Sequence, residues 1–284
     1  MPPAPRSYRS PYDLEEERAM AQGRLDGLRA LVVGGGSGIG YASARLLGRD
    51  GALVTIAGRT QDKLDAAAAR LREEEGLAVR TARCDTLVPA DVEHAVEIAG
   101  DGERLDIGVT VPGGGSFQPV LTYEPDQFSQ EVDLNVRPVF LLIRYGAAAM
   151  TGGGSIVAIS STAAVFSTRF LASYAAGKAA VDHLVRVAAD ELGERGIRVN
   201  AVRPGLTRTG STTGMLGNEA VRAAFLAAQP IDRHGEADDT AAAVRFLAGP
   251  ESSWVTGQQI SVDGGHTLRS FPDVLSLLTP IPKG

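Results

Sequence analysis

Short apolar runs alternate with helix-like patterns along the chain from Leu28 onward. Apolar runs that end in glycine or polar residues predict buried strands over 31–33, 53–57, 79–83, 107–111, 154–160, 197–202 and 258–262. Apolar residues at helical spacing predict helices over 41–49, 63–75, 91–98, 126–150, 174–194 and 237–248. Such alternation is typical of a doubly wound parallel sheet with helices on both faces. We therefore expect a single α/β domain.

The two ends of the chain depart from this alternation. Residues 1–27 are rich in proline and then in charge, which predicts a loose arm with a short helix around 14–21. Residues 266–284 form a tail that contains Leu275, Leu277, Leu278 and Ile281. This tail either covers the pocket of a neighbouring subunit or packs at the edge of the fold. The main domain is then bounded at 28–265.

Composition narrows the classes of function. The chain of 284 residues has 28 Lys and Arg against 34 Asp and Glu, a net charge of −6, and 44% of it is apolar. These values predict a large core and argue against a nucleic-acid partner or a membrane surface. The single Cys84 excludes an intrachain disulfide and a thiolate zinc site. Since no stretch is typical of a membrane span or a secretory signal, we expect a cytoplasmic protein. We also expect that it has no metal centre.

A glycine-rich loop lies between the first predicted strand and the following helix. It reads Gly34-Gly35-Gly36-Ser37-Gly38-Ile39-Gly40, with glycines at 34, 38 and 40 in place of the G-x-G-x-x-G spacing. Glycines let a backbone approach a pyrophosphate, and the free N–H groups at the start of the helix attract negative charge. The loop predicts a dinucleotide site, and the simpler alternative is a plain glycine turn.

The residues after the second and third predicted strands bear on the choice of dinucleotide. An NAD site usually has an acid about 20 residues past the loop, and here Arg59 stands 19 residues after Gly40. A guanidinium pairs well with a 2′-phosphate, so we expect NADP, with NAD still possible. The competing acid, Asp62, suits the first turn of a helix. Asp85 is expected to contact the adenine, or else to cap its own loop.

Tyr174 and Lys178 stand four residues apart on a predicted helix, so they share one face. A nearby ammonium favours the phenolate form and so makes the phenol a usable acid and base. Ser161 follows the fifth predicted strand, where its hydroxyl is expected to hold a substrate oxygen. Asn135 is expected to hold a water molecule or the lysine in place, and its alternative role is to bond its own helix backbone.

Together these residues resemble the short-chain dehydrogenase/reductase family, a group with a Rossmann-type fold, over about residues 28–265. The matching positions are Gly34, Gly38, Gly40, Asp85, Asn135, Ser161, Tyr174, Lys178, Pro204, Gly205 and 262–265 (Val-Asp-Gly-Gly). The resemblance implies a proton relay through Asn135, Ser161, Tyr174 and Lys178. It also implies that Lys178 binds the nicotinamide ribose. Pro204 and Gly205, the Leu206 backbone and the Thr209 hydroxyl would hold the carboxamide or the phosphates. A homodimer or homotetramer, joined through the two long helices, is expected.

The chain departs from the family pattern at three places. After the fourth predicted strand it has Thr110-Val111-Pro112-Gly113 where the family usually has Asn-Asn-Ala-Gly. Thr110 replaces only part of the first asparagine's tie between strands, and Pro112 removes a backbone donor. Val33 stands where threonine is common, and Ser37 is not the basic residue frequent in NADP-preferring relatives. The last departure weakens the expectation of NADP.

The substrate side is predicted around residues 206–230. This glycine-bearing segment is expected to form a mobile lid over the pocket. An apolar pocket is expected from Phe117, Phe166, Phe170, Met215 and Leu216, although these residues are equally typical of a core or an oligomer contact. His183 and His234 are expected at the surface or in an interface.

The leading hypothesis is an NADP-linked oxidoreductase that interconverts a ketone and a secondary alcohol. Tyr174 would be the acid and base, Lys178 would lower its pKa, Ser161 would orient the oxygen and Asn135 would support the relay. An NADPH-binding sensor without catalysis is the alternative from another class of protein. An enoyl reductase is disfavoured because the members of the family with that activity space tyrosine and lysine more widely.

Overall fold

The computed structural model describes residues 25–269 and 274–278, and its centre is a seven-stranded parallel sheet. The strands lie in the order β3-β2-β1-β4-β5-β6-β9. Their bounds are β1 (Arg29–Val33), β2 (Leu53–Gly58), β3 (Arg80–Arg83), β4 (Ile107–Thr110), β5 (Gly154–Ile159), β6 (Ile197–Pro204) and β9 (Gln259–Val262). All seven strands agree with the sequence prediction to within a few residues. The inner strands β1, β2, β4, β5 and β6 are largely buried between two covered faces, whereas one residue of the edge strand β3 and none of the edge strand β9 is buried.

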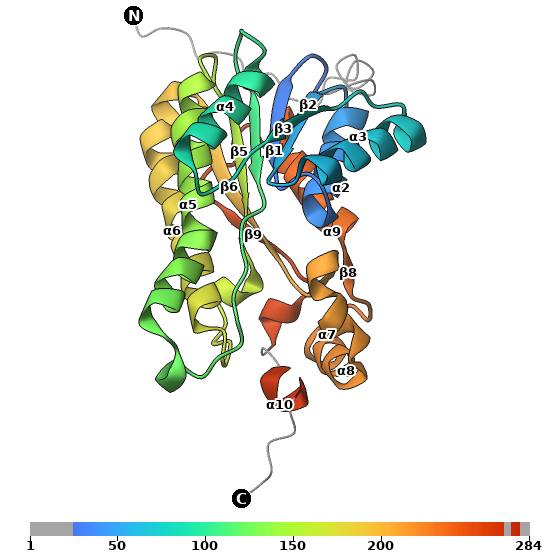
Figure 1. Ribbon diagram of the computed structural model, residues 1–284, viewed down its shortest axis with the longest axis vertical. Helices are drawn as coiled ribbons and strands as arrows, with labels where there is room; N and C mark the ends of the chain where they lie inside the picture. Colours follow the sequence, from blue (N-terminus) through green and yellow to red (C-terminus); the bar gives the residue numbers. More distant parts are fainter. Residues whose placement is uncertain (1–24, 270–273, 279–284) are drawn as a thin grey trace, which may run out of the picture.

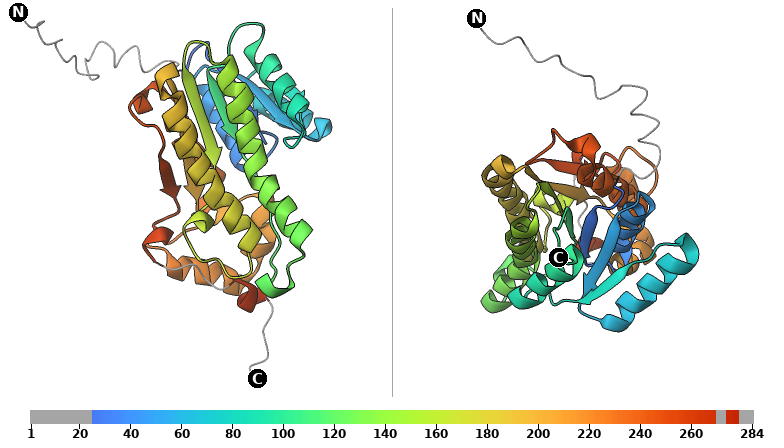
Figure 2. Two further views of the ribbon diagram at one scale, coloured as in Figure 1. Left: turned by 90° about the vertical axis from the view of Figure 1, so that its left-hand side faces the viewer. Right: turned by 90° about the horizontal axis from the view of Figure 1, so that it is seen from above.

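Helices cover both faces of the sheet (Figure 1). The helices are α2 (Gly38–Arg49), α3 (Gln61–Glu75), α4 (Pro89–Gly100), α5 (Pro125–Ala149), α6 (Ala172–Leu192), α7 (Thr213–Gly217), α8 (Glu219–Ala228), α9 (Ala237–Ala248) and α10 (Val274–Leu278). Helices α2, α3 and α9 pack on one face, and α4, α5 and α6 pack on the other. The two longest helices, α5 and α6, run side by side (Figure 2). The doubly wound sheet expected from the sequence is confirmed.

Strand order reverses between β1 and β4, and this reversal positions the candidate site. Val33 at the end of β1 is in register with Thr110 at the end of β4, so the chain leaves these neighbouring strands toward opposite faces. The glycine loop follows β1, and the segment 111–119 follows β4. In open parallel sheets, ligands bind in the crevice outside the carboxyl ends of strands at such a reversal.

Several features were not expected from the sequence. Two short strands, β7 (Thr207–Arg208) and β8 (Gly235–Glu236), form a separate two-stranded sheet. The segment 206–230 is largely helical, since it contains α7 and α8. The core begins at Leu25, which is fully buried although it belongs to the stretch predicted as an arm. The helix expected around 14–21 lies outside the described residues.

Within the ranges 25–269 and 274–278, no helix combines the length and the apolarity needed to cross a bilayer. The same ranges hold no group of three His, Cys, Asp or Glu side chains arranged around a metal ion.

Candidate active site

The glycine loop makes the tight turn from β1 into α2 that its composition predicts. Gly34 and Gly38 have φ values of 85° and 52°, which side chains rarely allow. A Cβ on Gly35 would lie 2.7 Å from Ile56, and one on Gly40 would overlap the carbonyl oxygen of Gly34. The loop therefore needs glycine at these positions for its own packing.

Gly36 differs from its neighbours because its packing does not require glycine. A Cβ there would approach no atom closer than 3.6 Å, and φ is not in the left-handed region. Ser37 is the N-cap of α2 and makes no side-chain cap, and the first turn of α2 contains no acidic residue. The backbone N–H groups from Gly38 onward are thus oriented for an anion, and the loop fits a dinucleotide pyrophosphate.

Two arginines stand at the ends of β2 and β3. Arg59 is exposed and makes no hydrogen bond or ion pair with the described residues. Arg83, which the sequence analysis did not single out, is exposed as well and is in register with Gly58, the residue before Arg59. Strand register, invisible in a linear sequence, brings this second cation near the first. Both are available to a phosphate group.

Asp85 occupies the turn after β3. Its carboxylate accepts a 3.0 Å hydrogen bond from the Leu87 N–H, and its own N–H donates to Asp91 at 2.9 Å. Capping of its own loop, the simpler of the two alternatives, is therefore observed. The second carboxylate oxygen accepts no hydrogen bond from the described residues, and the expected contact with an adenine stays a prediction.

Tyr174 and Ser161 meet at the end of β5. Ser161 follows that strand and accepts a 3.1 Å hydrogen bond from the Ala163 N–H. Burial raises the pKa of the Tyr174 phenol, and a hydrogen bond with the Ser161 side chain acts in the opposite direction. The phenol is consequently protonated at neutral pH when no ligand is bound, and it is in contact with the hydroxyl predicted to share its substrate.

Lys178 is buried beneath Tyr174, with 1% of its surface exposed. Its Nζ lies 5.5 Å from the centre of the tyrosine ring and donates to the carbonyl oxygens of Pro112 (2.8 Å) and Ile159 (2.9 Å). Burial lowers the pKa of Lys178 to about 7, although the charge of Asp182 opposes this shift. An ammonium has three donors, so one N–H remains for a further partner.

Asn135 connects helix α5 with the segment after β4. Its Nδ2 donates to the carbonyl oxygens of Gly114 (2.9 Å) and Glu131 (2.8 Å), while its Oδ1 is buried without a partner among the described residues. A Cβ on Gly113 would lie 2.7 Å from Oδ1 and 3.1 Å from the Lys178 Nζ. Gly113 thus leaves room for both polar groups, and the unpaired Oδ1 suits the water molecule that the sequence analysis expected.

Gly177, like Arg83, was missed by sequence reasoning. A Cβ on Gly177 would lie 2.8 Å from the Cβ of Asn135, so glycine lets α6 approach α5 where Asn135 and Lys178 face each other. Its position directly before Lys178 was the available signal.

The departures after β4 have separate consequences. Thr110 is fully buried, and its hydroxyl makes no hydrogen bond with the described residues. It therefore supplies no side-chain tie, which is less than the partial replacement expected. Pro112 keeps the carbonyl that Lys178 uses.

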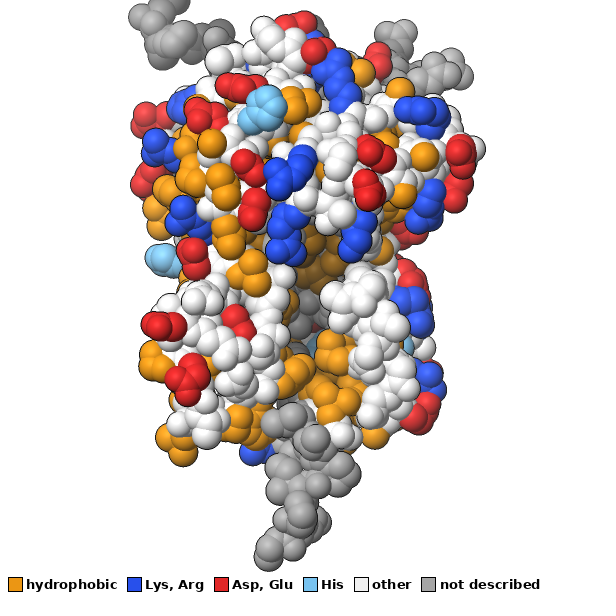
Figure 3. Space-filling view, in the orientation of Figure 1, with side chains coloured by type: hydrophobic (Ala, Val, Ile, Leu, Met, Phe, Trp, Pro, Cys, Tyr) orange, Lys and Arg blue, Asp and Glu red, His pale blue; other side chains and the backbone are white. Residues whose placement is uncertain are grey.

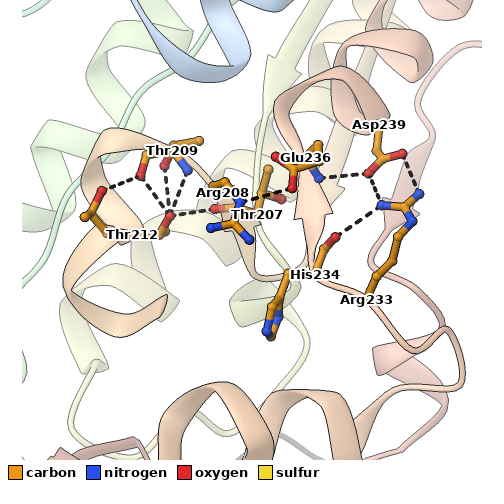
Figure 4. Close-up of polar contacts among 9 residues, drawn as sticks. Thr207, Arg208, Thr209, Thr212, Arg233, His234, Glu236 and Asp239 are labelled. Carbon is orange, nitrogen blue, oxygen red and sulfur yellow. Dashed lines mark hydrogen bonds and ion pairs between the residues drawn. The ribbon is translucent and has the colours of Figure 1, made fainter. Parts of the chain in front are cut away.

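Thr209 lies against the glycine loop from the opposite side. A Cβ on Gly38 would lie 3.2 Å from the methyl group of Thr209. Figure 4 shows Thr209 joined to Thr212 at the start of α7, while Arg208 and Glu236 pair across β7 and β8.

Pro204 and Gly205, the two residues expected to hold the cofactor ahead of Leu206 and Thr209, precede β7. The Gly205 N–H donates to the Val262 carbonyl at 3.0 Å, and a Cβ on Gly205 would lie 2.9 Å from the Cα of Asp263. The two sequence motifs at 204–205 and 262–265 are therefore packed on each other.

The predicted apolar pocket is only partly assembled as expected. Phe117, Met215 and Leu216 meet in one cluster with Leu206, Val221, Phe225, Val274 and Leu277. Figure 3 shows hydrophobic side chains along the hollow between the α5 side and the α7–α8 side. Phe166 stacks on His266 at 4.9 Å and also borders, with Phe170, a separate cavity of about 480 Å³.

The two histidines expected at the surface differ from each other. His183 is exposed, as predicted. His234 is buried, with 8% of its surface exposed, so that prediction was wrong. Burial lowers the pKa of His234, and the charges of Arg208 and Arg222 lower it further. It lies beneath the β7–β8 sheet in Figure 4.

Comparison with known proteins agrees with this geometry. A family model described as "Enoyl-(Acyl carrier protein) reductase" matches residues 34–267. An uncharacterized oxidoreductase of Mycobacterium tuberculosis is 36% identical over 263 residues, which cover 91% of this chain and 97% of the relative. A 3alpha-hydroxysteroid dehydrogenase of Mediterraneibacter gnavus is 36% identical over 242 residues, covering 83% and 95%. A solved short-chain type dehydrogenase/reductase from Mycobacterium ulcerans has a TM-score of 0.86 at 37% identity, covering 90% and 95%.

Proposed function

The chain belongs to the short-chain dehydrogenase/reductase family of oxidoreductases, and from that premise we propose that it interconverts a ketone and a secondary alcohol with NADP(H). The observation that carries the proposal is the meeting of Tyr174, Ser161, Lys178 and Asn135 at the carboxyl ends of β4 and β5. A bound nicotinamide supplies the hydride for reduction and accepts it for oxidation.

Tyr174 and Ser161 handle the substrate oxygen in this proposal. The Ser161 hydroxyl holds the carbonyl oxygen by a hydrogen bond, and the Tyr174 phenol donates its proton to the same atom as charge develops there. Burial raises the pKa of Tyr174 in the chain without cofactor, so a cation beside the phenol would have to lower this pKa for the phenol to act as an efficient acid and base near neutral pH. In the reverse direction the phenolate accepts the proton of the alcohol.

Lys178 and Asn135 return the proton. With two N–H groups of Lys178 occupied by carbonyl oxygens, the third is free for a ribose hydroxyl. The unpaired Oδ1 of Asn135 is suited to hold a water molecule near the Lys178 Nζ. Lys178 and the water molecule at Asn135 would supply the proton that returns to the Tyr174 phenol, and Lys178 would also hold the ribose of a bound cofactor.

Preference for NADP over NAD rests on charge. The pair Arg59 and Arg83 offers two guanidinium groups where the adenine ribose is expected. The competing acid, Asp62, lies in the first turn of α3. A guanidinium group donates two parallel hydrogen bonds to the oxygens of a phosphate. The ribose hydroxyls of NAD do not repel it.

An apolar ketone is the first substrate class to test. The cluster around Phe117, Met215 and Leu216 presents apolar side chains beside the site, and the Mediterraneibacter gnavus relative is a 3alpha-hydroxysteroid dehydrogenase. We place residues 206–230 as a lid over this pocket, hinged on the β7–β8 sheet.

The test is an absorbance assay of purified protein with NADPH and a panel of cyclic and linear ketones, with an enoyl thioester as the alternative substrate. Oxidation of NADPH by ketones, and none with the enoyl thioester, is expected. Turnover of the enoyl thioester alone would instead favour the enoyl reductase activity after which the matched family model is named. Tight NADPH binding without turnover of any compound would favour the sensor.

Assembly and location complete the proposal. Phe140 on α5 and Val187 on α6 are 47% and 43% exposed on the two long helices that lie side by side. Large apolar side chains exposed on neighbouring helices favour a homodimer or homotetramer joined there. We propose a cytoplasmic location.

A further inference from the structure

Glu131 on α5 gathers hydrogen bonds from three separate parts of the chain. Its Oε1 accepts from the Ser116 hydroxyl (2.7 Å) and the Gln127 amide (3.1 Å). Its Oε2 accepts from the Ser116 N–H (3.0 Å), the Ser173 hydroxyl (2.6 Å) and the Tyr123 hydroxyl. Five donors thus converge on one carboxylate, which has about four lone pairs to offer.

No cation accompanies this charge. Among the described residues Glu131 makes no ion pair, and each of its donors is neutral. Although partial burial would raise the pKa of Glu131, the hydrogen bonds from Ser173, Tyr123 and Ser116 outweigh burial and lower it to about 2. The carboxylate is therefore ionised at every pH at which the protein would work, and all five donors are held by a charge.

The carboxylate lies where the catalytic elements meet. Ser173 is fully buried and directly precedes Tyr174 on α6. A Cβ on Gly115 would lie 2.8 Å from the Tyr174 Cβ and 3.5 Å from the Glu131 Oε2. Gly115 is thus packed between the carboxylate and the tyrosine. The Glu131 carbonyl oxygen, in turn, receives the Asn135 amide.

The segment after β4 needs such an anchor. Residues 113–115 are three consecutive glycines, which have the largest freedom of any backbone. Thr110, where the family resemblance leads us to expect a tie between strands, has no hydrogen-bonding partner for its hydroxyl among the described residues. Side-chain hydrogen bonds hold this stretch to α5 from the Asn135 amide at Gly114 and from the Glu131 carboxylate at Ser116, where the Gln127 amide adds a longer contact of 3.4 Å.

We propose that Glu131 is a positioning residue of the active site: its carboxylate fixes the segment Gly113–Ser116 against α6 and thereby sets the place of Tyr174. This inference rests on the proposed function. Glu131 touches neither substrate nor cofactor in this account, and it acts through Ser116 and Ser173. A displacement of about 1 Å at a reacting group can cost about 100-fold in rate, so the anchor has a kinetic consequence.

The test compares Glu131→Gln with Asp133→Asn. The glutamine keeps the shape of the side chain, but it removes the charge and replaces one acceptor oxygen with an amide donor. The Gln127 amide would then face another donor. Asp133 is exposed on the same helix two residues later, and its variant loses the same charge away from the segment. The measurements are kcat, the KM for the ketone, the Kd for NADPH by fluorescence, and hydrogen–deuterium exchange of a peptide spanning 113–117.

For Glu131→Gln we expect kcat to fall about tenfold or more, with the ketone KM and the NADPH Kd changed less than threefold. Exchange of the 113–117 peptide should become faster, and Asp133→Asn should match the wild type throughout. A kcat within twofold of the wild type, or unchanged exchange in that peptide, would overturn the inference.

Two further outcomes are a variant that does not fold and a wild type that shows no turnover. If Glu131→Gln does not fold, Ser173→Ala removes a single hydroxyl and should lower kcat about threefold with faster exchange, and unchanged values would reject the anchor. If the wild type turns over no substrate, the proposed function fails, while exchange of the 113–117 peptide, which needs no substrate, still decides whether Glu131 holds the segment.

Discussion

The Lys178 ammonium donates a 2.8 Å hydrogen bond to the carbonyl oxygen of Pro112. Pro112 is one of the residues that replace the usual motif after β4, and a proline keeps its carbonyl although it loses its N–H. The substitution therefore spares the contact that Lys178 makes with this segment. Burial of a lysine in this contact has a measurable consequence for stability.

We predict that Lys178→Met removes a pH dependence of folding. Burial lowers the pKa of Lys178 from its usual value near 10.5 to about 7, so between these values the unfolded chain binds a proton that the folded chain does not. The free energy of unfolding of the wild type therefore rises with pH over this range, by up to about 1.4 kcal/mol per pH unit from this one group. Urea denaturation without cofactor at several alkaline pH values measures the slope. If the free energy of unfolding rises equally with pH in the wild type and in the variant, the lowered pKa of Lys178 is contradicted.

Tyr174→Phe should abolish turnover and leave NADPH binding intact. The variant loses only the hydroxyl that donates and accepts the proton, while the ring packed above Lys178 remains. The rate should fall by at least about 1,000-fold, and the fluorescence titration with NADPH should be unchanged. Tyr145→Phe, on α5 and packed against the core, is the matched control. Residual turnover near the wild-type rate would remove Tyr174 from its role.

Gly36→Ala separates cofactor binding from folding. Its Cβ would meet no protein atom closer than 3.6 Å, so the melting temperature should stay close to that of the wild type. The added methyl group stands where a backbone must approach the pyrophosphate, so the Kd for NADPH should rise about tenfold or more. Gly193→Ala, whose Cβ would meet nothing within 4 Å and which lies outside the proposed lid, is the control. Unaltered affinity would place the dinucleotide elsewhere.

Arg59→Ala should reverse the choice of cofactor. Loss of a charged hydrogen bond to a 2′-phosphate costs about 1.5–3 kcal/mol, which corresponds to about 10- to 100-fold weaker NADPH binding. NADH, which has no such phosphate, should bind as before. Arg72→Ala removes an exposed arginine near the end of α3 as a control. If the binding of NADPH and of NADH weakens equally, Arg59 does not bind the 2′-phosphate. Arg83→Ala then becomes the next variant to compare.

Phe140→Asp should break the proposed assembly. Phe140 is 47% exposed on α5, and an aspartate there would bury an unpaired charge in any interface through that helix. Light scattering after size exclusion should give a smaller species than the wild type. An exposed apolar residue far from α5 and α6, such as Leu53, offers the matching Leu53→Asp control. A wild-type monomer would exclude the assembly altogether.

The inner strands of the sheet were predictable because they are buried on both faces and appear as apolar runs, such as Leu53–Gly58. The positions of the tyrosine, the lysine and the glycine loop followed from helical spacing and from the strand–loop–helix setting. Arg83 and Gly177 were harder, because their relevance comes from strand register and from the close approach of two helices.

Glu131 could not have been predicted from the sequence. Its five donors come from Ser116, Tyr123, Gln127 and Ser173, which span 57 positions along the chain, and no short motif joins them. A lone glutamate on the predicted helix 126–150 is typical of a solvated surface. The burial of His234 was not predicted either. The β7–β8 sheet that covers it consists of two-residue strands, which carry no periodic signal in the sequence.

The contact of Thr209 with Gly38 bears on the order in which the cofactor and the substrate bind. Because the proposed lid begins beside the glycine loop, we expect a dinucleotide to enter the crevice before the lid closes over the substrate. Reactants should then enter in a compulsory sequence, with the nucleotide first on and last off. Its departure would set the pace of each cycle.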